Sequence, residues 1–190
     1  MIAPDGSVHG MPANRLKIEF DPSPTPSLSW FKVTTPDGNV FLFEDEELTV
    51  SETVCGGSGT VNTYNSSWYL TKIISADRLD SVLFTYGTAL ISHPVSRSET
   101  DYQFVTVQAG SGNCATQSPS LCHTIVETEI KYLTEIKTVR ETVNFYSNGN
   151  RLDIANTRML DSVVIARNGW KINSFHLAHS YFQTQVGLAS

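Results

Sequence analysis

The feature that most constrains the fold is a series of short segments in which apolar and polar residues alternate. The first segment covers residues 30–34, and the turn Pro36-Asp37-Gly38-Asn39 separates it from a second extended segment at 40–43. Alternation with a period of two places successive side chains on opposite faces of a strand, and Pro, Asp and Gly favour turns. The pattern predicts a β-hairpin, and helical periodicity is largely absent.

Three later parts of the chain repeat this arrangement. The paired segments are 68–75 with 81–86, 132–138 with 142–146, and 159–165 with 171–177. The last pair is joined through Asn168-Gly169, the strongest short hairpin signal in the chain, because both central positions of a type I′ turn need positive φ. The units form a degenerate internal repeat, and an isolated two-stranded hairpin is only marginally stable in water. We therefore expect the hairpins to pack beside one another.

The remaining segments complete the predicted architecture. Further strands are expected at 16–20, 102–107 and 124–130, flexible glycine-rich loops at 55–59 and 110–113, and a solvated edge or loop, or one helical turn, at the acidic run 44–48. We predict a single all-β domain over 1–190, with 1–15 and the proline-containing segment 21–29 irregular. Consecutive antiparallel hairpins would form a large curved sheet or shell-like β-structure. A two-sheet β-sandwich and a partly closed barrel remain alternatives.

Charge and hydropathy exclude some classes of partner. The 190 residues carry a net charge of -6 with only 13 Lys and Arg, so the chain offers no basic footprint for nucleic acid or an anionic membrane surface. No run approaches the roughly 18 apolar residues of a membrane span, and the start lacks the regions of a signal peptide. We expect no membrane insertion, and a piece of a larger protein.

Three cysteines are too few for a disulfide framework. Cys114 and Cys122 flank a short segment and are candidates for a disulfide in an oxidising compartment. A zinc site formed by these two residues with Cys55 and His123 is disfavoured, because no Cys-x-x-Cys pair is present.

The sequence contains no recognisable catalytic motif. No nucleophile elbow or triad signature occurs, and the histidines are scattered. Four aspartates lie beside turns, where Asp commonly hydrogen-bonds its own backbone, and the spacing of a dedicated calcium loop is missing. These aspartates are Asp77, Asp80, Asp153 and Asp161. We expect no enzyme activity, no metal and no cofactor.

Aromatic residues offer the one candidate ligand surface. Trp30, Trp68 and Trp170, with several tyrosines, are candidates for a stacking platform that binds sugar rings. Cross-strand packing is the competing interpretation, because most of these residues lie in alternating segments beside aliphatic residues. The sequence also contains a weak N-glycosylation acceptor, Asn65-Ser66-Ser67.

Residues 30–43 and 65–73, together with Arg158-Met159-Leu160-Asp161-Ser162-Val163 and 175–182, resemble the region that precedes the repeats in bacterial surface proteins of the RHS/YD-repeat type. The similarity extends from about Leu16 onward, but the Tyr-Asp-x-x-Gly-Arg-Leu repeat itself is absent. The resemblance implies a secreted or cell-surface role, strands wound into a shell, and attachment to further repeats. It carries over no functional residue.

Two functions follow from these observations as hypotheses. The first is a structural shell module whose partners are neighbouring segments of the same large protein. The second is a carbohydrate-binding or protein-binding adhesion domain that uses exposed aromatics. The first predicts exposed edge strands, and the second predicts that at least two of Trp30, Trp68, Trp170 and the tyrosines are exposed together, so burial of the aromatics distinguishes them.

Overall fold

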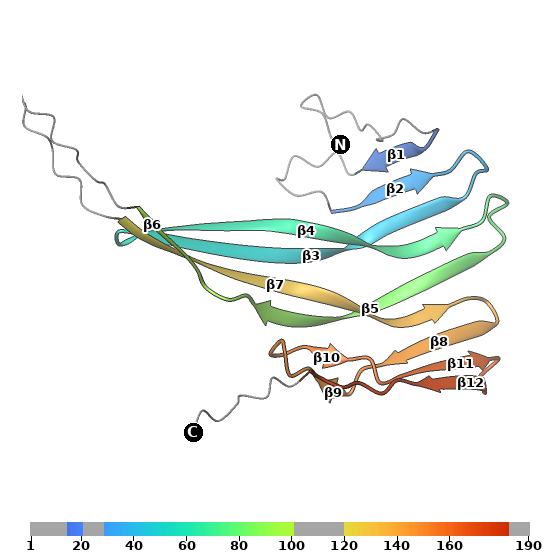
Figure 1. Cartoon of the computed structure of the whole chain (residues 1–190). Coiled ribbons are helices and arrows are strands. Elements are labelled where there is room, and N and C mark those ends of the chain that lie inside the picture. The colour runs from blue at the N-terminus through green and yellow to red at the C-terminus, as the bar shows by residue number, and fades with distance from the viewer. Residues whose placement is uncertain (1–14, 21–28, 101–119, 183–190) are drawn as a thin grey trace, which may run out of the picture.

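The computed structural model describes residues 15–20, 29–100 and 120–182 of the chain, and all of its regular structure there is β (Figure 1). The strands are β1 Lys17–Phe20, β2 Phe31–Thr34, β3 Val40–Cys55, β4 Ser58–Ile74, β5 Ser81–Ser92, β6 Ser96–Thr100, β7 Ser120–Lys137, β8 Glu141–Tyr146, β9 Gly149–Asn150, β10 Arg158–Met159, β11 Ser162–Arg167 and β12 Trp170–His176. The all-β prediction is confirmed.

One large antiparallel sheet contains most of these strands. Ten strands form it, and β9 and β10 form a separate two-stranded ribbon. The described residues contain no second large sheet, so they do not form the alternative two-sheet β-sandwich. The predicted segments 102–107 and 110–113, and nearly all of the predicted irregular segments, lie outside the described residues.

The four hairpins predicted from the sequence are present, and a main-chain hydrogen bond closes the turn in three of them. The Thr35 N–H donates to the carbonyl of Asn39 at 2.9 Å, the Ser75 N–H to that of Asp80 at 3.0 Å, and the Thr138 N–H to that of Glu141 at 2.8 Å. In the fourth, Asn168 and Gly169 have φ of 49° and 82°, as a type I′ turn requires.

Three strands are much longer than the alternation suggested. β3 has 16 residues, β4 has 17 and β7 has 18. The predicted glycine-rich loop is only a two-residue turn, in which Gly56 and Gly57 both have positive φ, and it joins β3 directly to β4. The alternation pattern does not predict this hairpin, because residues 58–67 have few apolar side chains and little alternation.

The sequence predicts a loop, a solvated edge or one helical turn at the acidic run 44–48. The structure shows that this prediction is wrong, because the run lies in the middle of β3. Its carboxylates are matched by polar groups on neighbouring strands: Asp45 by Lys131 at 2.9 Å, Glu46 by the side-chain amide of Asn65, and Glu47 by the hydroxyl of Tyr69 at 2.8 Å. Cross-strand partners of this kind remove the cost of placing charge inside a sheet.

The order of strands changes along the sheet. At one end β4 lies beside β5, through pairs such as Lys72 with Leu83. Beyond Glu47, β3 instead lies beside β7, from Leu48 opposite Glu129 to Cys55 opposite Cys122. The two strands of the β3–β4 pair therefore exchange sides along their length, and so do those of the β5–β7 pair. Figure 1 shows both crossings near the middle of the molecule.

The crossings divide the sheet into two parts. We call the described residues 15–20, 29–43, 67–86 and 134–182 the body. We call 44–66, 87–100 and 120–133 the arm, which extends to the left in Figure 1.

Polar and aromatic contacts gather near the crossing, where the hydroxyl of Tyr69 in the body donates to Glu47 in the arm. The side chain of Lys131 is only 11% exposed and bridges Asp45 and Glu129. The rings of Tyr69 and Tyr86 lie 5.2 Å apart, and Tyr86 donates to the carbonyl of Leu70 at 2.9 Å. Burial, reinforced by the hydrogen bond to Glu47, raises the pKa of Tyr69 to about 12.

The described residues hardly form a hydrophobic core. Val40 is the one buried apolar residue among them, and no large side chain is fully buried. A sheet gains stability by burying one face against another layer. The described part of the chain leaves both faces of its sheet without such a layer.

Candidate interaction surface

The strand register places large apolar side chains on one face of the body. Residues directly opposite in an antiparallel ladder share a face, and so do residues two apart along a strand. One row of opposed residues runs Ile18, Val33, Phe41, Ile73, Val82. A second runs Phe84, Ile136, Val143, Ile165.

With their neighbours two residues away, these rows form what we call the apolar face. It comprises Ile18, Phe20, Phe31, Val33, Phe41, Phe43, Ile73, Val82, Phe84, Ile136, Val143, Phe145, Val163, Ile165 and Phe175. The rings of Phe31 and Phe43 stack at 4.4 Å, and Trp68 meets Phe31 edge-on at 6.1 Å. Apart from the exposed Phe175, these residues are half-buried by their own neighbours.

The opposite side of the body, which we call the lysine face, alternates lysines with aliphatic residues. One row runs Lys32, Leu42, Lys72, Leu83, Lys137 across five strands. Lys17 and Lys171 lie on the same face.

Only two of the five lysines on the lysine face form ion pairs among the described residues. Lys32 and Lys17 hold Glu19 at 2.7 and 3.1 Å, and their hydrogen bonds lower the pKa of that carboxyl. In the described part of the chain, Lys72, Lys137 and Lys171 have no ion-pair partner.

The arm also has two unlike faces. On one, Thr49 bonds Thr128 at 3.1 Å and Thr53 bonds Thr124 at 3.0 Å, so hydroxyl groups pair across the strands. The other, which we call the acidic arm face, combines carboxylates with exposed aliphatic side chains. Its register places together Leu48, Val50, Glu52, Val61, Leu90, Ile125, Glu127 and Glu129.

A disulfide joins Cys55 to Cys122 near the outer end of the arm. The two cysteines are directly opposite in the β3–β7 ladder, with Cα atoms 4.2 Å apart. The candidate Cys114–Cys122 pair is therefore not formed, because Cys122 is bonded to Cys55; Cys114 itself lies outside the described residues. The sequence could not reveal this, since the pairing depends on a contact between strands 67 residues apart.

The three tryptophans do not gather at one place. Trp68 lies against the apolar face and Trp30 is half-buried just before β2. Trp170 begins β12, at the far end of the strand order, and is 80% exposed. Among the three, Trp170 alone is free to stack on a ligand.

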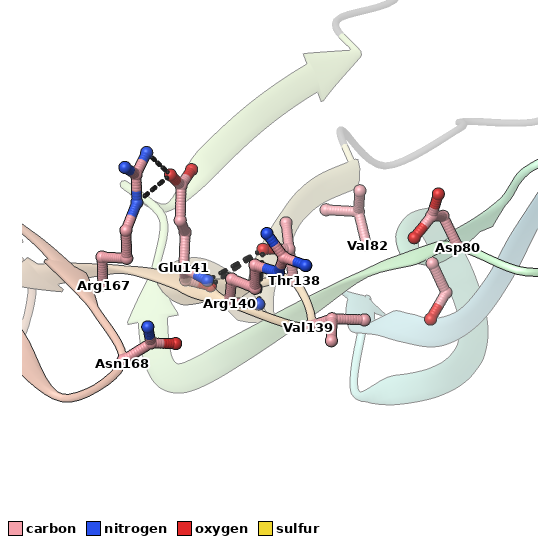
Figure 2. A pocket seen from close by; sticks show the side chains of 9 residues that line it. Asp80, Val82, Thr138, Val139, Arg140, Glu141, Arg167 and Asn168 are labelled. Atoms are coloured by element: carbon pink, nitrogen blue, oxygen red, sulfur yellow. Dashed lines mark hydrogen bonds and ion pairs between the residues drawn. The ribbon is translucent and has the colours of Figure 1, made fainter.

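A shallow open hollow of about 800 Å³ lies where three hairpin turns meet, and Figure 2 shows its lining. Arg167 directs its guanidinium at Glu141, with Nε donating at 2.9 Å, so each neutralises the other. Asn168 donates its N–H to the carbonyl of Arg140 at 2.9 Å. These contacts connect neighbouring turns. The lining of the hollow contains no histidine or cysteine beside the Arg167–Glu141 pair.

The turn aspartates are used by the fold. Asp77 accepts from Ser75 and from the Leu79 N–H, and Asp161 accepts from the Gly149 N–H at 3.1 Å. Asp153 accepts hydrogen bonds from Nε and Nη2 of Arg151, which lower its pKa to about 2. Within the described residues, no three His, Cys, Asp or Glu side chains form a group able to hold a metal.

Comparison of the chain with protein-family models, curated proteins and solved structures gave no match. The described residues include no helix with the length and hydropathy needed to cross a membrane.

Proposed function

We propose that the chain is a structural module without catalysis of its own, one β-layer of a larger extracellular or cell-surface assembly. The observation that carries this proposal is the apolar face of the body, which has no second layer over it in the described part of the chain. Nine strands about 4.8 Å apart span roughly 40 Å. A patch of this width that extends roughly 15 Å along the strands has an area that approaches the surface each partner buries in a stable protein interface, about 800 Å².

Two further observations support this proposal. The Cys55–Cys122 disulfide is typical of proteins that fold in an oxidising compartment. The resemblance to the region before YD repeats implies the same location and names the partners as neighbouring segments of one large protein. Those segments would cover the apolar face and thereby stabilise the sheet.

A hydrophobic dye tests whether the apolar face is open. The folded chain at low concentration should bind the dye, and Ile165→Lys, on the apolar face, should reduce the signal severalfold. The matched control is Val164→Lys, one residue away on the opposite face, which should leave dye binding unchanged. A folded chain that binds no dye would overturn the proposal, because its apolar face would already be covered.

The exposed Trp170 favours adhesion as a second candidate function. An aromatic ring that is 80% exposed can stack on a sugar ring. A glycan-array screen of the chain beside Trp170→Ala tests this. Binding that the substitution abolishes would establish adhesion, and an array without binding would remove Trp170 as a glycan site.

A further inference from the structure

The described charges are distributed unequally between arm and body. The arm contains two cations, Arg97 and Lys131. Its carboxylates are Glu44, Asp45, Glu46, Glu47, Glu52, Glu99, Glu127 and Glu129. The lysine face of the body carries the opposite net charge, because its five lysines outnumber Glu19 and Glu135, which the register places on the same face. A chain whose ends differ in charge attracts the unlike end of another copy.

The acidic arm face presents carboxylates that the chain itself does not neutralise. Among the described residues, Glu52 is exposed and has no ion pair, and Glu127 is exposed and accepts a hydrogen bond from the hydroxyl of Ser92 at 3.0 Å but has no ion pair. Glu129 already pairs with Lys131 at the inner end. Exposed aliphatic side chains lie between these carboxylates, with Leu90 54% and Val61 61% exposed.

The lysine face presents the complementary set. Lys72 and Lys137 lack ion-pair partners among the described residues, and they stand on either side of Leu83, which is 41% exposed. Each surface therefore alternates charged and aliphatic side chains, with opposite sign. Apolar contact and unlike charge would act together when one surface lies on the other.

We propose that the acidic arm face of one copy docks on the lysine face of the body of a second copy. The inference rests on the proposed function, because it names a second copy as one partner of the module. It uses a different surface from the apolar face, which stays available to the other layer. The thin, projecting shape of the arm suits it to reach a neighbouring body (Figure 1).

Sedimentation of purified chains tests the proposal. The native chain should associate at low salt, and its dissociation constant should rise on the order of tenfold or more when salt is increased, because salt screens exposed charges. An arm variant, Glu52→Lys with Glu127→Lys, and a body variant, Lys72→Glu with Lys137→Glu, should each be monomeric. A chain that carries all four changes should associate again, because both surfaces are reversed.

Controls separate site effects from net charge. Asp37→Lys with Asp80→Lys alters net charge as the arm variant does, and Arg15→Glu with Arg140→Glu alters it as the body variant does, but these residues lie in turns or before β1, outside the strand ladders that form both surfaces. Both controls should associate as the native chain does. A mixture of arm and body variants should form heterodimers, since one copy keeps its arm and the other its lysine face.

The proposal is overturned if the native chain is monomeric at low salt, or if the four-change chain stays monomeric while each control associates. It is also overturned if either paired variant associates normally. Dye binding to the apolar face is independent of these results. A failure of docking with retained dye binding would remove the arm–body contact and leave the structural module in place.

Discussion

At the scale of single residues, the turns are where sequence and structure agree most closely. Gly169 has φ of 82° and nothing within 4 Å of where a Cβ would lie, so its requirement is purely one of backbone conformation. The neighbouring Asn168 also has positive φ, which Asn tolerates better than most residues.

We predict that Gly169→Ala lowers the free energy of unfolding by about 1 kcal/mol, because a Cβ at positive φ approaches the backbone. Asn168→Gly, the matched change at the adjacent position, should be neutral or slightly stabilising. Urea denaturation of both variants measures the difference. Equal effects at the two positions would contradict the type I′ turn.

Tyr69 gives a prediction in alkaline solution. Its pKa of about 12 in the folded chain lies above the unfolded value, so the unfolded tyrosine loses its proton first. The stabilisation is therefore complete below about pH 10 and is lost as the pH rises toward 12.

An absorbance titration of tyrosinate should show a late component in the native chain that becomes smaller in Tyr69→Phe, while Tyr86, whose pKa is also raised by burial, still contributes to it. Tyr146→Phe, at an exposed tyrosine, is the control and should retain the late component. A smaller late component in the control, or an undiminished one in Tyr69→Phe, would place the most perturbed tyrosine elsewhere.

At the scale of strands and hairpins, local pairing could be predicted and distant pairing could not. The turn near Asp37-Gly38 lies between alternating segments, so its hairpin was visible in the sequence. The pairing of Leu48 with Glu129 depends on the twist of two hairpins that close far apart in the chain. No local pattern encodes that contact, and the acidic run therefore resembled a loop.

The candidate surfaces show the same limit. Alternation indicates that each strand has an apolar side, but only the register shows that Val33 and Ile165 share one face. The tryptophans do not form one platform, because Trp68 lies in β4 and Trp170 in β12, which are far apart in the strand order.

The disulfide provides a prediction at this scale. Closing a loop across 67 residues restricts the unfolded chain, and the chain-entropy model gives about 4 kcal/mol of stabilisation for such a loop. Cys55→Ser should lose much of it, whereas Cys114→Ser should have little effect. Peptide mapping under non-reducing conditions should recover a crosslink between the peptides of Cys55 and Cys122, and a crosslink to Cys114 instead would contradict the observed pairing.

At the scale of the whole molecule, the central feature is a sheet whose apolar face has no layer over it within the described residues. Val40 is the one buried apolar residue in the described ranges, whereas a self-sufficient domain of this size buries many. We therefore expect the stability of the fold to depend on association, either with another layer or with a second copy.

The most direct test is urea denaturation of the native chain over a hundredfold range of chain concentration. Since association stabilises only the folded state, we predict that the urea midpoint rises with chain concentration. A high midpoint that is the same at every concentration would contradict it, because the chain would then be stable as a lone monomer.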